Sequence, residues 1–374
     1  MDFRTRSNRP EPSTADWLEG LHIDMWLLML IGALAIIGLV VLYSASGHSI
    51  SQVISQAERV LMGLVIMAIV AQAPTEIYRA MAPWLYGITV ILLVLTLLLG
   101  STSKGAQRWL DLGVVRFQPS ELMKLAMPLT VAAFLHQRSL PPRLTTILIT
   151  LIIIAVPTGL IAKQPDLGTA LLVVAAGTFA LYFSGFAWKW IIGAIAIVAA
   201  AAPIAWGKMH DYQRQRILTL LDPESDPLGA GYHITQSKIA IGSGGLFGKG
   251  WLNGSQAKLE FLPESHTDFI FAVYSEEFGL LGILLLLAIY LAIVGRCLFI
   301  ALRAQDSFQR LLASSLAMTF FIYVFINMGM VIGLLPVVGV PLPLVSYGGT
   351  SAVTLLVSFG MLMSIQTHRK LLSK

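Results

Sequence analysis

The chain has 374 residues, of which 56% are apolar and 12% charged, with a formal net charge of +5 and one cysteine, Cys297. Typical soluble domains are about 45–50% apolar and about 25% charged, so these values exclude a soluble globular domain, a disordered chain and a disulfide scaffold. The composition indicates a polytopic membrane protein, and its positive charge therefore does not indicate a nucleic-acid partner.

Long apolar runs predict an all-α membrane domain over residues 25–366, with about ten spanning helices. A spanning helix needs roughly 20 mostly apolar residues. The runs that fit this length are, in chain order, 25–44, 57–73, 82–100, 119–135, 144–162, 167–184, 187–206, 268–301, 310–335 and 346–366. One large extracytoplasmic loop, 207–267, separates the seventh predicted helix from the eighth.

The two polar tails, 1–24 and 367–374, are predicted to lie in the cytoplasm. An even number of spans places both tails on one side of the membrane. The tails and short loops on that side carry 13 Lys or Arg residues, against 6 in the short loops and span ends opposite. Basic residues accumulate in short cytoplasmic loops, so this asymmetry predicts the orientation. The first apolar run is then a retained signal anchor.

Six basic residues oppose that trend at the outer ends of spans two to five: Arg59, Lys104, Arg108, Arg116, Lys124 and Lys163. Nearby acidic residues offer a structural explanation through pairing: Glu58, Asp111, Glu121 and Asp166. Because several loops converge on this face, we favour a site that requires positive charge.

The segment 101–124 joins two spans and contains candidate site residues. Ser120 is a plausible N-cap for the next helix, with Glu121 in the first turn, where the helix dipole favours an anion. Glu121 and Lys124 are three residues apart and can pair. Pairing explains Glu121, but a cation one turn inside a span is costly and usually faces a cavity.

Trp109 follows Arg108 in the same segment. Trp109 is consistent with an interfacial aromatic belt. It is equally consistent with a flat surface for a sugar or lipid, with Arg108 binding a phosphate. Asp166, after Pro165, is a good N-cap for the sixth span, unless it also faces the cavity.

The long loop holds two recognisable stretches. Residues 211–221 have a basic head followed by apolar residues, which suits a helix lying in the membrane interface. Residues 241–255 contain six glycines but match neither the phosphate-loop nor the dinucleotide pattern, so we expect a folded or mobile loop.

Thr267 or Asp268 is expected to open the eighth helix. Asp268 lies in line with a stripe of small residues, Ala272, Ser275, Gly279 and Gly282, which would let another helix approach closely. Asp268 is then either an N-cap or a carboxylate at the mouth of a cavity, near His266. The prolines of 335–351 predict irregular backbone that lines the same cavity. No metal-ligand motif occurs.

The stretches GAQRWLDLG, FQPSELMK, QPDLGT, GAGYHITQSKIAIGSGGL, FLPESHTDFIFAVYSEEFG and PLPLVSYGGTS occur in this order over roughly residues 25–370. In these stretches the chain resembles the SEDS family (shape, elongation, division and sporulation proteins). The resemblance implies a ten-span peptidoglycan glycosyltransferase that polymerises lipid II for elongation and rod shape. It implies a class B penicillin-binding protein as partner, with other elongation-complex proteins. It maps the essential aspartate to Asp268 and further functional residues to Trp109, Glu121, Lys124 and Asp166.

The implied chemistry fits the residues present. An α-linked diphosphate donor and a β-1,4 product require inversion, which one displacement with a general base provides. Asp268 is the candidate base. Arg59, Arg108 and Lys124 are candidates for stabilising the departing lipid diphosphate, since they supply positive charge where negative charge develops. No cofactor is predicted, and a divalent cation on the diphosphate is left open.

A lipid II flippase is the alternative, because a polar cavity would serve transport as well. The chain shows no internal repeat, which counts against a transporter. Its charges also gather on the outer face rather than along a path through the midplane. A scaffold without catalysis would leave the outer cations unexplained.

Overall fold

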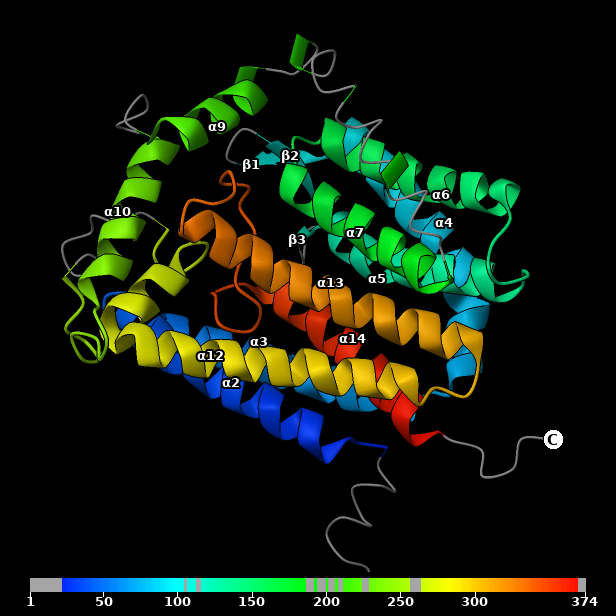
Figure 1. Ribbon diagram of the computed structural model, residues 1–374, viewed down its shortest axis with the longest axis horizontal. Helices are drawn as coiled ribbons and strands as arrows, with labels where there is room; N and C mark the ends of the chain where they lie inside the picture. The colour runs from blue at the N-terminus through cyan, green and yellow to red at the C-terminus, as the bar shows by residue number, and fades with distance from the viewer. Residues whose placement is uncertain are drawn as a thin grey trace, which may run out of the picture.

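The computed structural model describes residues 22–103, 106–111, 116–185, 192–193, 200, 206–207, 211–223, 229–255 and 264–368. Its described helices that run along the bundle are α2 (Met25–Ala45), α3 (Ile50–Gln72), α4 (Thr75–Leu99), α5 (Pro119–His136), α6 (Leu144–Lys163), α7 (Leu167–Phe183), α12 (Ile270–Leu302), α13 (Ser307–Val331) and α14 (Gly349–Thr367) (Figure 1). Two further helices, α9 (Asp211–Leu221) and α10 (Ala230–Ser243), lie in the predicted long loop.

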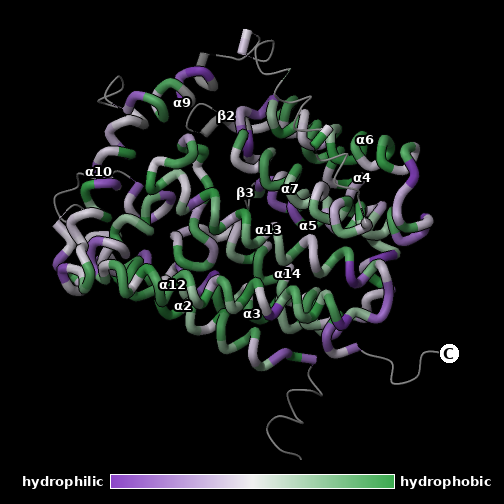
Figure 2. The backbone as a smooth tube through the Cα atoms, viewed as in Figure 1, coloured by the Kyte–Doolittle hydropathy of each residue, from purple (hydrophilic) through white to green (hydrophobic). Residues whose placement is uncertain are grey.

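The helical membrane fold is confirmed. Seven helices of the described part are long and apolar enough to cross a membrane: α2, α3, α4, α6, α12, α13 and α14. Figure 2 shows hydrophobic residues over most of their length. α7 is a shorter apolar helix, and α5 carries Glu121 and Lys124. The seventh predicted span, 187–206, lies almost wholly outside the described residues, so the count of ten stays a prediction.

Most predicted boundaries agree with the helices, but two helices begin earlier than expected. α3 begins at Ile50 rather than at residue 57, and α4 begins at Thr75 rather than at 82. Polar side chains in their first turns keep these residues out of an apolar run. Arg59 is therefore inside α3 rather than at its end.

Nine helices meet at one end of the described bundle, which we call the site end. It is the end where α2, α4, α6 and α13 finish and where α3, α5, α7, α12 and α14 begin. Glycines allow close packing within the bundle. A β-carbon on Gly360 of α14 would lie 2.6 Å from the Met67 carbonyl oxygen of α3. α13 is the most enclosed of the seven long helices and packs against α12, α7 and α5.

A small antiparallel sheet, in the order β1–β2–β3, lies at the site end between α4 and α5. Its strands are β1 (Ser101–Ser103), β2 (Ala106–Asp111) and β3 (Arg116–Phe117). β2 pairs Leu110 with Phe117 of β3. The sheet is an addition to the predicted fold, and β2 carries Arg108 and Trp109.

The described parts of 207–267 contain more helix than the sequence predicts. The helix α9 is confirmed as a helix. The helix α10 was missed, because its glycines and the turn-rich stretch before it masked the helical run. It packs on α13, where Ser237 Oγ donates to the Val331 carbonyl oxygen at 2.7 Å. The backbone between α13 and α14 is irregular, as its prolines predict.

Candidate functional site

A cavity of about 230 Å³ opens at the site end. It brings together five of the eight predicted site residues: Arg108, Trp109, Glu121, Lys124 and Asp166. The rest of its wall comes from the 339–341 loop, from the start of α14 and from Gln118, Thr169, Leu172 and Tyr323. Residues far apart in the chain thus form one polar cavity.

Asp166 both caps a helix and lines the cavity. Its Oδ1 accepts from the Thr169 backbone N–H at 3.2 Å, which confirms the predicted N-cap of α7. Its Oδ2 accepts from Gln118 Nε2 at 3.0 Å and lies 4.0 Å from Arg108 Nε. Arg108 also donates to the carbonyl oxygens of Gln164 and Pro165. These bonds hold the Arg108 guanidinium in place at the cavity.

The first turn of α5 supplies a buried ion pair. Lys124 Nζ donates to Glu121 Oε1 at 2.6 Å, as the spacing predicts, and both side chains are buried. The prediction that Ser120 caps this helix is wrong. The N-cap is Gln118, which makes no side-chain cap bond, and Pro119 occupies the first helical position, where proline is common.

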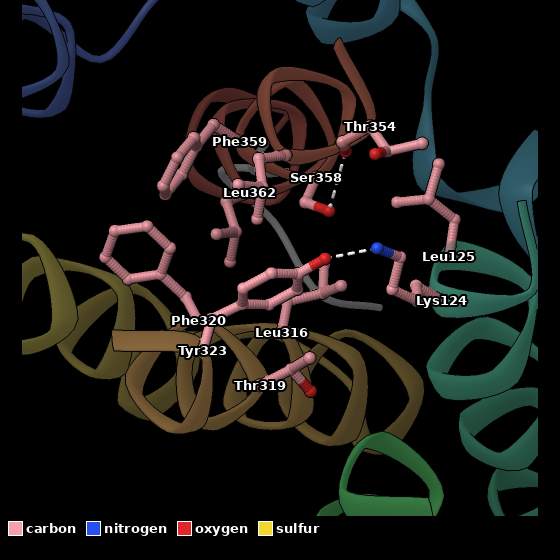
Figure 3. A pocket seen from close by; sticks show the side chains of 11 residues that line it. Lys124, Leu125, Leu316, Thr319, Phe320, Tyr323, Thr354, Ser358, Phe359 and Leu362 are labelled. Atoms are coloured by element: carbon pink, nitrogen blue, oxygen red, sulfur yellow. Dashed lines mark hydrogen bonds between the residues drawn. The ribbon is translucent and has the colours of Figure 1, made fainter. Parts of the chain in front are cut away.

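Two partners from other helices complete this pair. Tyr323 of α13 accepts a hydrogen bond from Lys124 Nζ through its hydroxyl oxygen (Figure 3). Thr354 Oγ1 of α14 donates to Glu121 Oε2 at 3.0 Å. Two of the three ammonium N–H bonds of Lys124 thereby have partners in the described part of the chain.

Lys124 and Tyr323 also line a second, smaller cavity of about 20 Å³ between α5, α13 and α14. Figure 3 shows the hydroxyls of Thr354 and Ser358 above this space and the apolar side chains of Leu316 and Phe320 around it. Lys124 and Tyr323 thus line both cavities, and the smaller one has room for about one water molecule.

Asp268 is half-buried and lies just before α12. The prediction that Thr267 or Asp268 opens this helix is wrong, since its N-cap is Phe269, without a side-chain cap bond. A β-carbon on Gly339 would lie 3.4 Å from Asp268 Oδ2, and Gly339 lines the cavity. The Asp268 carboxylate therefore lies at the cavity edge.

The backbone around Asp268 is held by α13 and by the loop before α14. Asn327 Nδ2 donates to the Asp268 carbonyl oxygen at 2.9 Å and to that of Val340 at 2.7 Å. Ser346 Oγ donates to the Thr267 carbonyl oxygen at 2.5 Å. These bonds join the Asp268 turn directly to the wall of the cavity.

The remaining two predicted residues lie beside the cavity rather than in its wall. The His266 carbonyl oxygen accepts from the Tyr347 backbone N–H at 2.9 Å. The Arg59 guanidinium lies 4.9 Å from the centroid of the Tyr347 ring. A β-carbon on Gly349, which lines the cavity, would lie 3.0 Å from Arg59 Cδ. The Arg59 side chain thus lies directly against Gly349, a residue of the cavity wall.

Sequence reasoning missed Gln118, Tyr323, Asn327 and Thr354. Asn327 carries the clearest signal, because a buried amide in an apolar helix needs partners, and polar residues within spans often mark a site. No group of three or more His, Cys, Asp or Glu side chains in the described residues is arranged to hold a metal ion.

Comparison with known proteins gives a consistent result. The profile of the FtsW/RodA/SpoVE family, described as "Cell cycle protein", matches residues 23–371. The chain is 56% identical over 364 residues to peptidoglycan glycosyltransferase MrdB of Escherichia coli K12, covering 97% of this chain and 98% of that protein. It is 36% identical to the probable peptidoglycan glycosyltransferase FtsW of Trichlorobacter lovleyi, covering 93% and 94%.

Solved structures show the same similarity. One chain of a peptidoglycan synthase complex, described for its coordination of polymerization and crosslinking, matches with a TM-score of 0.81 and 30% identity, covering 92% of this chain and 97% of that one. The rod shape determining protein RodA of Thermus thermophilus matches with a TM-score of 0.71 and 28% identity, covering 93% and 98%.

Proposed function

Because the chain belongs to the FtsW/RodA/SpoVE family, we propose that it is a peptidoglycan glycosyltransferase that polymerises lipid II into glycan strands. Its identity to MrdB, 56% against 36% for an FtsW, supports a role in elongation and rod shape rather than in division. This agrees with the sequence resemblance to the SEDS family and, within it, to RodA.

One observation carries the catalytic assignment: the Asp268 carboxylate lies against Gly339, a wall residue of the cavity that presents Arg108 and Lys124. In the proposed reaction the acceptor hydroxyl attacks the anomeric carbon of the donor. Its proton passes to Asp268, and the bond to the lipid diphosphate breaks with inversion. A positioned general base contributes typically 10²–10⁴-fold to such a step.

The cations divide into two kinds. Arg108 is held at the cavity by two backbone carbonyl oxygens, and its contact with the Asp166 carboxylate is a long one of 4.0 Å, so we assign it the stabilisation of the departing diphosphate. Arg59, which lies against Gly349, is the second candidate for stabilising the departing diphosphate. Lys124 is neutralised by Glu121, and we assign it one hydrogen bond to the substrate rather than a full charge. Trp109 and His266 are assigned to the sugar or lipid by their position at the same end.

The orientation and the partner belong to the same proposal. The distribution of Lys and Arg supports cytoplasmic termini and a site end facing outward from the bacterial cytoplasmic membrane. The similarity to a chain of a peptidoglycan synthase complex supports a class B penicillin-binding protein as partner.

The experiment uses the purified chain in detergent with labelled lipid II, assayed for polymer with and without EDTA. We expect polymer from the parent protein. Loss of polymer with EDTA would assign a role to a divalent ion on the diphosphate. A flippase predicts no polymer, since detergent leaves no membrane to cross, and that result would refute the proposal.

A further inference from the structure

The helix that follows Asp268 is broken. Gly279 has φ 63° and ψ −162° within α12, so residues 270–278 and 280–302 form two separate helical parts. This backbone region is essentially restricted to glycine. Because of the break, the long part of α12 does not determine the direction of the short part. Something else must orient the short helix that begins two residues after Asp268.

The glycine segment, residues 244–255, fills the break. A β-carbon on Gly279 would lie 2.3 Å from the Gly248 nitrogen, so the two backbones are in direct contact. Backbone hydrogen bonds cross between them on both sides of the break: Lys249 N–H to Glu276 O (3.0 Å), Gly250 N–H to Glu277 O (3.0 Å), Leu280 N–H to Gly245 O (2.9 Å) and Leu281 N–H to Leu246 O (3.1 Å). The segment thus replaces hydrogen bonds that a continuous helix would make.

Two adjacent buried carboxylates fasten the segment to the short helix. Glu276 is 0% exposed, and its Oε1 accepts from Lys249 Nζ at 2.6 Å and from the Ser255 N–H at 2.9 Å. Glu277 Oε1 accepts from Ser44 Oγ of α2 and from the Leu252 N–H at 3.2 Å. These bonds therefore join the C-terminal end of the short helix to the glycine segment and to α2.

We infer that Lys249 and Glu276 are positioning residues that place the Asp268 carboxylate at the cavity. The Asn327 bond fixes the Asp268 end of the short helix, and the Lys249–Glu276 pair fixes its other end, eight residues or roughly 12 Å along the helix axis. Neither residue is among those that line the cavity, so both act through the orientation of this helix. The inference rests on the proposed function, because it assumes that Asp268 is the base.

The size of the effect follows from the geometry. A misplacement of about 1 Å in a reacting group can cost about 10²-fold in rate. Removing Lys249 also leaves Glu276 buried without its cation, and such a carboxylate will shift or draw in water. We therefore expect Lys249→Met and Glu276→Gln to lower kcat at least tenfold, with KM for lipid II within threefold of the parent. Lys249→Arg, which keeps the cation, should restore most of kcat.

The chain supplies a matched control on the same helix. Arg296, near the opposite end of α12, pairs with Asp24 at 2.5 Å, with side chains 22% and 2% exposed. The Lys249–Glu276 pair is 2.6 Å long, with side chains 31% and 0% exposed. Asp24→Asn removes the buried carboxylate of its pair, as Glu276→Gln does, so it should lower the unfolding temperature by a comparable amount but leave kcat within twofold of the parent.

The assay is polymer formation by purified full-length protein from labelled lipid II, with unfolding temperatures measured in the same detergent. If Glu276→Gln does not fold, Lys249→Met, which alters the more exposed partner, carries the test. If the parent polymerises lipid II and Lys249→Met has the same kcat as the parent, this inference alone is overturned. It is also overturned if Asp24→Asn loses as much kcat as Lys249→Met does. A parent that makes no polymer would overturn the proposed function and the inference with it.

Discussion

At the scale of single residues, the site depends on charges that are buried and paired. Lys124 lies in the first turns of α5, where an unpaired ammonium would be expensive, and Glu121 and Tyr323 satisfy it. The Glu121 partner could be predicted from a spacing of three residues. The Tyr323 partner could not, because 199 residues separate it from Lys124 and only packing brings them together.

The pair can be tested by comparing a single variant with a double variant. Lys124→Met should destabilise the fold by about 3–5 kcal/mol, since it leaves the Glu121 carboxylate buried without its cation. The double variant Glu121→Gln/Lys124→Met should recover most of this stability and stay inactive. Denaturant titration and polymer assays measure the two quantities. A double variant that polymerises lipid II like the parent would show that the pair is only structural.

Tyr323 offers a milder test of the same contact. Tyr323→Phe keeps the ring and removes the hydroxyl that accepts from Lys124, so stability should fall by about 1.5–3 kcal/mol, the usual contribution of a hydrogen bond to a charged group. We expect kcat to fall about tenfold, because the Lys124 ammonium loses its fixed position. Tyr86→Phe, which removes a hydroxyl bonded to the Ile153 carbonyl oxygen between α4 and α6, is the control. Equal activity in both variants would contradict the assignment.

At the scale of elements, apolar runs predicted the helices well and their breaks poorly. α6 begins at the predicted residue and ends within one residue of the prediction, because its apolar run ends at polar and turn residues. The prediction that the small residues below Asp268 form one stripe against a second helix assumed that α12 is continuous. It is wrong, because α12 breaks at Gly279. Gly279 is approached by the glycine segment rather than by a second helix. No local pattern announces such a break, since it depends on backbone supplied from residues 244–255.

The break predicts a contrast between two glycines of α12. Gly279→Ala should destabilise the protein by about 2–3 kcal/mol, because alanine cannot adopt this backbone conformation without strain and its β-carbon would meet Gly248. Gly295→Ala should be neutral or stabilising by up to about 1 kcal/mol, since that position is helical with open space around it. Unfolding in detergent compares them, and equal stabilities would mean that α12 is continuous.

At the scale of the whole molecule, composition and apolar runs were enough to predict a helical membrane bundle, while the side of the membrane that the site end faces stays a prediction. The cavity lies at the site end, and its wall includes Arg108 and Lys124, two of the six cations that oppose the charge trend. The sequence could not predict that the Arg59 side chain lies against Gly349 in the cavity wall, because this contact joins α3 to the start of α14. The sheet at Trp109 was missed for a similar reason, since its strands are too short to show a pattern.

The orientation of the bundle is open to a labelling test. Phe247, at the site end, is 78% exposed, and Ser139, between α5 and α6, is exposed at the opposite end. Phe247→Cys should react with an impermeant maleimide in intact spheroplasts, while Ser139→Cys should react only after lysis. The native Cys297 is buried and should give little background. Labelling in the reverse order would place the site end in the cytoplasm.

Polymer formation by the Asp268→Asn protein tests the central claim most directly. Asparagine keeps the size of the side chain but cannot take the proton of the acceptor hydroxyl, so we expect polymer from lipid II to fall by about 10²–10⁴-fold, with folding intact. Asp306→Asn is the control, because Asp306 caps α13 at the opposite end through the Gln309 N–H at 2.7 Å. It should polymerise like the parent. An Asp268→Asn protein that polymerises at the parental rate would contradict the account and move the base to Glu121 or Asp166.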